Sequence, residues 1–121
     1  MIRNVLVLDD HPNILILLER ILKLNDHNVY AFERPEKALE FLLTTDIKMD
    51  IMFIDFMLPI MDGLEVAQEI KSYEQFSGIP IYMISSHNGD LIRKKADEIL
   101  TNGFIDKPIN SKQLLSIVDS L

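Results

Sequence analysis

Several short apolar runs in this sequence end in side chains that suit metal and phosphate chemistry. Asp9 and Asp10 follow the first run, Asp55 follows an internal one, and Ser85 and Lys107 stand at the ends of the last two. Carboxylate oxygens in small number suit Mg²⁺ (or Mn²⁺), which typically binds one or two acids together with a phosphate. An ammonium and a hydroxyl can bind the phosphoryl oxygens. The set predicts a site for phosphoryl transfer if the fold brings these run ends together.

Clustered acids carry an energetic cost, which argues for a use. Two carboxylates about 4 Å apart repel by roughly 4 kcal/mol at an effective dielectric constant near 20. A domain that is stable by only ~5–15 kcal/mol would not keep such a cluster without a function. Strands that merely end in polar residues would explain one or two of these side chains, but not a set with complementary chemistry.

The elements that must position these residues alternate along the chain. Apolar, β-branched runs predict strands at 4–8, 28–32, 49–54, 79–84 and 103–106. The segments between and after them predict helices at roughly 12–24, 35–45, 62–74, 89–100 and 110–120. The third and fourth runs are continuously apolar, which is typical of parallel strands covered on both faces. We therefore expect a single doubly wound α/β sandwich, whose ligands bind beyond the carboxyl ends of the strands.

Composition limits the class of protein. The 121 residues predict one domain over 1–121, and 48% hydrophobic and 26% charged residues are ordinary values for a soluble globular chain. A net charge of −7 argues against direct binding to nucleic acid. The absence of cysteine fits a reducing cytoplasm, and no apolar stretch approaches the length of a membrane span.

Four motifs together carry a family resemblance. The segments VLVLDD, FIDFMLPIMDG, PIYMISS and FIDKP occur in this order and cover essentially the whole chain. Their order and spacing resemble the receiver domain of response regulators in two-component signalling, such as those of chemotaxis. The resemblance implies a flavodoxin-like (βα)5 sandwich with a five-stranded parallel sheet of order 2-1-3-4-5. It also implies a phosphoacceptor switch that catalyses only its own phosphorylation and dephosphorylation.

The resemblance assigns roles to the residues of the site. Asp55 matches the phosphoacceptor, which takes a phosphoryl group from a phosphohistidine of a sensor histidine kinase or a histidine phosphotransfer protein. Asp9, Asp10 and Asp55 would hold Mg²⁺ together with the backbone carbonyl of Met57, and which of the first two contacts the metal directly is open. Lys107 matches the family's invariant lysine.

A second set of residues matches the family's switch. Ser85 corresponds to the switch hydroxyl and Phe104 to the switch aromatic. Their movement on phosphorylation would repack the face built by the helix at 89–100, the strand at 103–106 and the helix at 110–120. Such a face contacts a downstream protein, which the sequence does not name, and can also support a homodimer.

Two other functions fit the sequence less well than the switch. A Mg²⁺-dependent phosphohydrolase acting through an aspartyl phosphate usually carries its second acid in a D-x-D pattern, but Asp55 is followed by Phe56 and Met57. An interaction module that has lost phosphorylation would not need to keep the acids and Lys107.

The three histidines, His11, His27 and His87, fit no zinc spacing. His11 follows the acidic pair directly and is expected at the rim of the site. His87 lies two residues after Ser85, where the resemblance implies an influence on the access of water to the acyl phosphate.

Overall fold

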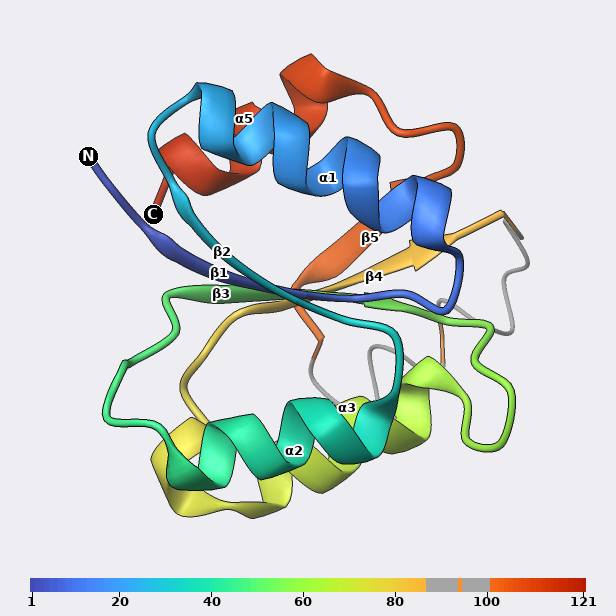
Figure 1. Cartoon of the computed structure of the whole chain (residues 1–121). Coiled ribbons are helices and arrows are strands. Elements are labelled where there is room, and N and C mark those ends of the chain that lie inside the picture. The colour runs from blue at the N-terminus through green and yellow to red at the C-terminus, as the bar shows by residue number, and fades with distance from the viewer. Residues whose placement is uncertain (87–93, 95–100) are drawn as a thin grey trace.

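The computed structural model describes residues 1–86, 94 and 101–121 (Figure 1). The strands are β1 (Asn4–Leu8), β2 (Asn28–Phe32), β3 (Ile51–Asp55), β4 (Ile81–Ser85) and β5 (Gly103–Asp106). The helices are α1 (Pro12–Leu24), α2 (Pro35–Thr44), α3 (Gly63–Ser72) and α5 (Ser111–Asp119), with a 3₁₀ turn, η1 (Glu74–Phe76). Except for Lys94, the helix predicted at 89–100 lies outside the described residues, and so does His87.

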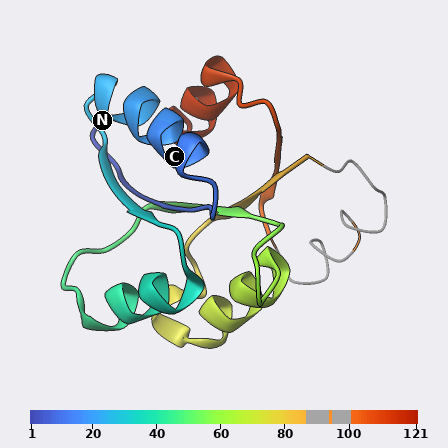
Figure 2. The same ribbon diagram turned by 45° about the vertical axis from the view of Figure 1, so that its right-hand side comes forward.

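The strands form one parallel sheet between two helical layers. Their order is β2-β1-β3-β4-β5, as predicted. α1 and α5 cover one face of the sheet, and α2 and α3 cover the other (Figures 1 and 2). The α/β sandwich is confirmed, and its strand order reverses between β1 and β3, where ligands of such sheets bind.

The core lies on both faces of the sheet because side chains alternate along each strand. Leu6, Leu8, Met52, Ile54 and Met83 contribute to the cluster beneath α2 and α3. The alternate positions, Val5, Val7, Ile51, Phe53 and Ile84, contribute to the cluster beneath α1 and α5. Burial of the strands from both sides explains why the third and fourth runs are continuously apolar.

Local sequence signals fix most helix starts. Pro12 and Pro35 occupy the first turns of α1 and α2, where a missing N–H costs little. The Asp62 side chain caps α3 by accepting from the backbone N–H of Glu65, and Asn110 caps α5 in the same way.

Two strands begin later than predicted. β3 starts at Ile51 and β4 at Ile81, each two residues after the expected position. Met49 and Ile79 are nevertheless packed into the core, which explains why the apolar pattern extended the predicted strands. As a result, Asp55 and Ser85 are themselves the last residues of β3 and β4.

The two chain ends are tied together at the amino edge of the sheet (Figure 1). The Arg3 guanidinium donates to the backbone oxygen of Leu121. The backbone N–H of Arg3 donates to Nδ1 of the buried His27, 3.1 Å away, and Nε2 of His27 lies 3.4 Å from Asp119 Oδ1. These contacts join β1, the start of β2 and the end of α5.

Candidate functional site: an acidic cluster at the carboxyl edge of the sheet

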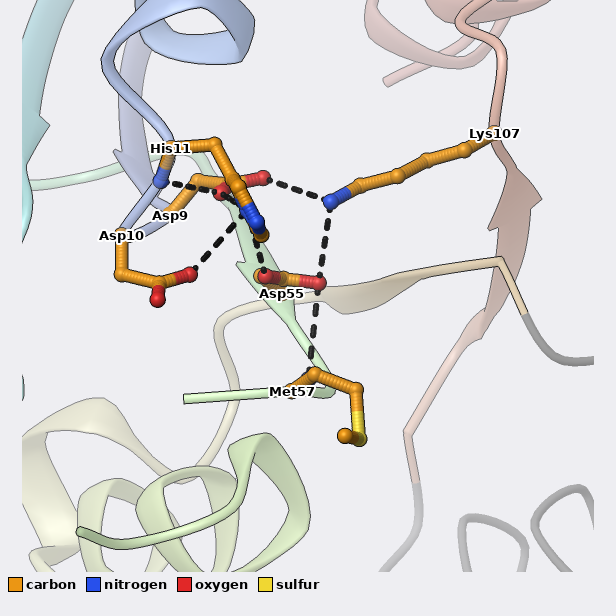
Figure 3. Close-up of polar contacts among 6 residues, drawn as sticks. All are labelled: Asp9, Asp10, His11, Asp55, Met57 and Lys107. Atoms are coloured by element: carbon orange, nitrogen blue, oxygen red, sulfur yellow. Dashed lines mark hydrogen bonds and ion pairs between the residues drawn. The ribbon is translucent and has the colours of Figure 1, made fainter. Parts of the chain in front are cut away.

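Three aspartates and a lysine meet at the carboxyl edge of the sheet (Figure 3). Asp9 directly follows β1, and Asp55 ends the neighbouring β3, whose Ile54 is in register with Leu8. This register places Asp9 and Asp55 side by side, and both are almost completely buried, at 0% and 1% exposure. Asp10 is next along the chain and is half-buried.

Lys107 spans the two buried carboxylates. Its Nζ lies 3.3 Å from Asp9 Oδ2 and 3.4 Å from Asp55 Oδ1. The backbone N–H of Lys107 donates to the carbonyl of Ser85 over 2.9 Å, which continues the β4–β5 pairing and fixes the base of the long side chain. One ammonium therefore faces two buried anions, so the site retains net negative charge.

The electrostatics of Asp55 reflect this imbalance. Burial, together with repulsion from Asp9, raises the pKa of Asp55 from 3.8 to about 6, although Lys107 and the backbone N–H of Met57 oppose the shift. This pKa lies below 7, so the carboxylate is the favoured form at pH 7. It can act as a nucleophile at neutral pH, but at a cost to the folded state.

A tight turn brings α3 against the end of β3. The backbone N–H of Gly63 donates to the carbonyl of Phe56 over 2.8 Å. A Cβ on Gly63 would lie 2.2 Å from the backbone oxygen of Asp55 and 2.6 Å from Met83 Cε, so no larger residue fits without a shift. The Met57 N–H, in the same turn, donates to Asp55 Oδ1 at 3.5 Å. The turn thus holds the Asp55 carboxylate from the backbone side.

The predicted switch residues flank the cluster. Ser85 is buried at 1% exposure and follows Ile84, whose register partner is Asp55. Phe104 is half-buried, pairs with Met83 across β4 and β5, and packs against the cluster beneath α2 and α3. Ser85 therefore lies beside the acids, and Phe104 lies further back along the adjacent strand.

His11 is the site residue whose position the sequence did not reveal. Its Nδ1 lies 2.9 Å from Asp9 Oδ1, 3.1 Å from Asp10 Oδ1 and 3.8 Å from Asp55 Oδ2 (Figure 3). The prediction of a rim residue agrees with its 58% exposed side chain, but the ring is turned into the acids. The only sequence signal for a role of His11 in the site was its position directly after Asp9 and Asp10.

The acidic cluster has the chemistry of a cation site. Asp9, Asp10, His11 and Asp55 each offer one ligand atom, and these four atoms lie within 4.8 Å of one another. The buried oxygens Asp9 Oδ2, Asp10 Oδ1 and Asp55 Oδ2 form no hydrogen bond to the described part of the chain. Lys107 Nζ lies 3.3 Å from the first of these oxygens and His11 Nδ1 lies 3.1 Å from the second, whereas Asp55 Oδ2 is 3.8 Å from His11 Nδ1. Buried polar atoms are normally satisfied, so the Asp55 oxygen fits a bound divalent cation.

The fold and the acidic edge define a class: a doubly wound α/β domain with a cluster of aspartates and a lysine at its topological switch point. Residues 5–119 match the response regulator receiver domain. The chain belongs to this family and is a receiver domain of two-component signalling.

Individual relatives agree with this assignment. The chain is 32% identical over 117 residues to the putative two-component response regulator ARR21 of Arabidopsis thaliana, a match that covers 94% of this chain and 18% of that protein. The chain thus spans less than a fifth of this relative's length.

Solved structures share the fold. The chemotaxis response regulator CheY4 of Vibrio cholerae superposes with a TM-score of 0.90 at 21% identity, covering 99% of this chain and 98% of CheY4. The BeF3-activated DrrB receiver domain gives a TM-score of 0.86 at 25% identity, covering 99% of this chain and 97% of the DrrB chain.

Among the helices that the structure describes, none has the length and apolar character needed to cross a bilayer.

Proposed function

We propose that this receiver domain accepts a phosphoryl group on Asp55 from a phosphohistidine. A carboxylate oxygen of Asp55 attacks phosphorus, the P–N bond breaks, and its electron pair leaves with the imidazole of the donor. The product is an acyl phosphate, which water later hydrolyses to inorganic phosphate and the original carboxylate. The observation that carries this proposal is the buried Asp55 carboxyl at the end of β3, 3.4 Å from the Lys107 ammonium.

The neighbouring residues have distinct tasks. Lys107 would shift from the carboxylates toward a phosphoryl oxygen, and the Ser85 hydroxyl would donate to another. Asp9, Asp10, Asp55 and the Met57 carbonyl would hold Mg²⁺ or Mn²⁺. When bound, the metal would neutralise negative charge on the phosphoryl oxygens.

The output of the site is a change in packing. Movement of Ser85 toward the phosphoryl group leaves space that Phe104 enters, and the face formed by β5 (Gly103–Asp106) and α5 (Ser111–Asp119) repacks. Two states that differ by a few kcal/mol suffice for such a switch. This face would contact a downstream protein or a second copy of the chain.

The partners follow from the chemistry. The donor is a sensor histidine kinase or a histidine phosphotransfer protein. The protein would act in the cytoplasm, and the absence of cysteine is compatible with this reducing compartment. Residues 1–121 would act as one receiver unit. The protein would be a switch and not a turnover enzyme.

Intact mass spectrometry after incubation with Mg²⁺ and acetyl phosphate tests the proposal. We expect a gain of one phosphoryl group per chain, lost in Asp55→Asn and with EDTA, and retained in Asp46→Asn, which makes the same change at an exposed acid. Sustained release of phosphate from many esters would instead indicate a phosphohydrolase. No mass gain under any condition would indicate an interaction module.

A further inference from the structure

The His11 ring is turned into the acidic cluster, and the role of His11 at the start of α1 does not require this orientation. It is the N-cap residue of α1, yet its side chain makes no capping hydrogen bond. Instead, the backbone N–H of His11 donates to Asp9 Oδ1 over 2.9 Å, and the same oxygen lies 2.9 Å from Nδ1 of the ring. Asp9 thus fixes both the backbone and the ring of His11, which holds Nδ1 over the acids.

The spacing of the four ligand atoms matches a coordination shell. His11 Nδ1 is 2.9 Å and 3.1 Å from oxygens of Asp9 and Asp10. Neighbouring ligand atoms of an octahedral ion with bonds of about 2.1 Å are about 3.0 Å apart. Asp55 Oδ2 is 3.8 Å from Nδ1. This distance is longer than that between two adjacent ligand atoms of such an ion and shorter than that between two ligand atoms on opposite sides of it.

The donor set differs chemically from an all-oxygen magnesium site. Mg²⁺ prefers hard oxygen ligands, whereas imidazole nitrogen favours transition metals, with affinity rising from Mn²⁺ through Co²⁺ to Ni²⁺. The nitrogen lies within 4 Å of one oxygen of each aspartate, and the most distant of these, Asp55 Oδ2, is buried without a hydrogen bond to the described residues. One imidazole nitrogen and carboxylate oxygens from three aspartates therefore face a common point.

We propose that His11 Nδ1 is a metal ligand that gives this cation site a preference for divalent transition metals over Mg²⁺. The proposal rests on the cation site of the proposed function and adds a ligand and a selectivity to it. A cation held this way would replace the direct contacts of the ring with Asp9 and Asp10 by metal–ligand bonds at similar atom separations, and Nδ1 would carry no proton. The same three carboxylates would bind Mg²⁺ without help from the ring.

Metal titration of wild type, His11→Asn and His11→Gln tests the proposal. The 58% exposed side chain of His11 makes both variants compatible with folding, which circular dichroism checks. Dissociation constants for Mg²⁺, Mn²⁺ and Ni²⁺, each added alone, would be measured by calorimetry. We expect the ratio of the Ni²⁺ to the Mg²⁺ constant to rise by at least about 10-fold in both variants, with a smaller rise for Mn²⁺. Asn13→Gln, an exposed change in the same turn of α1, should keep the wild-type ratio.

Cobalt spectroscopy gives a second readout. The visible absorption of the Co²⁺ complex should change when the nitrogen ligand is lost. A metal ratio within twofold of wild type, or an identical Co²⁺ spectrum in the His11 variants, would overturn the proposal and leave His11 as a neutralising partner of the acids. Phosphoryl uptake by the wild type, measured separately, reports on the proposed function, so the two can fail independently.

Discussion

Replacement of Asp55 by asparagine should stabilise the metal-free protein, because the buried charge of Asp55 destabilises the folded state. The change keeps the shape of the side chain and removes its charge beside Asp9. The pKa of Asp55 is raised from 3.8 to about 6, a difference of about 2 units. At 1.36 kcal/mol per unit, the ionised carboxylate costs the fold up to about 3 kcal/mol.

The sign of the pH dependence follows from the direction of this shift. Below pH 3.8, Asp55 is protonated in both the folded and the unfolded chain and costs nothing. Between pH 3.8 and about 6 the unfolded chain loses the proton first, so the cost grows, and above that range it is constant. The stabilisation by asparagine should therefore be near zero at pH 3.5 and full at pH 7.5.

Thermal unfolding in EDTA is the assay. For 121 residues the entropy of unfolding is about 0.25 kcal/mol/K, so 3 kcal/mol corresponds to an upper limit of about 12 °C in Tm. We expect a rise of about 5–12 °C at pH 7.5, and no comparable rise for Asp46→Asn. Addition of Mg²⁺ should stabilise the wild type more than the variant and narrow the gap. An Asp55→Asn protein no more stable than wild type at pH 7.5, or a gain independent of pH, would refute the reasoning.

Three further changes test how the site is held. Gly63→Ala should destabilise the fold by about 2 kcal/mol or more in urea unfolding, because its Cβ would overlap the backbone oxygen of Asp55; an unchanged midpoint would contradict this. Asp62→Ala should cost about 1 kcal/mol through loss of the α3 cap, whereas Asp62→Asn should cost less, and equal losses would argue against capping. Lys107→Met should raise the pKa of Asp55 further above its usual range, which carboxyl ¹³C NMR can follow, with the exposed Lys48→Met as control. A lower pKa of Asp55 in Lys107→Met would show that Lys107 is not the counter-charge of this carboxylate.

The sequence was sufficient to predict which strand ends meet. In a parallel sheet the carboxyl ends share one edge, so the ends of neighbouring strands β1 and β3 must bring Asp9 and Asp55 together. Helix starts were also predictable, because proline at the first turn and aspartate or asparagine at the cap act locally.

Other features depend on packing that the sequence does not record. Met49 and Ile79 are apolar because they fill the core, although neither lies in a strand, so periodicity alone misplaced two strand starts. The orientation of His11 is set by side-chain rotation after the chain leaves β1, and no sequence pattern fixes that rotation. The proximity of His11 to three carboxylates is therefore a result of the structure.

The contact between Arg3 and Leu121 has a practical consequence. Both termini emerge at the amino edge of the sheet (Figure 1), whereas Asp55 ends β3 and Lys107 directly follows β5 at the opposite edge. Attachment to a sensor chip through either terminus would therefore leave the acidic cluster facing the solution. A short linker could also join the two ends in a circular permutant, with new ends opened at the exposed segment around Asp46 and Ile47.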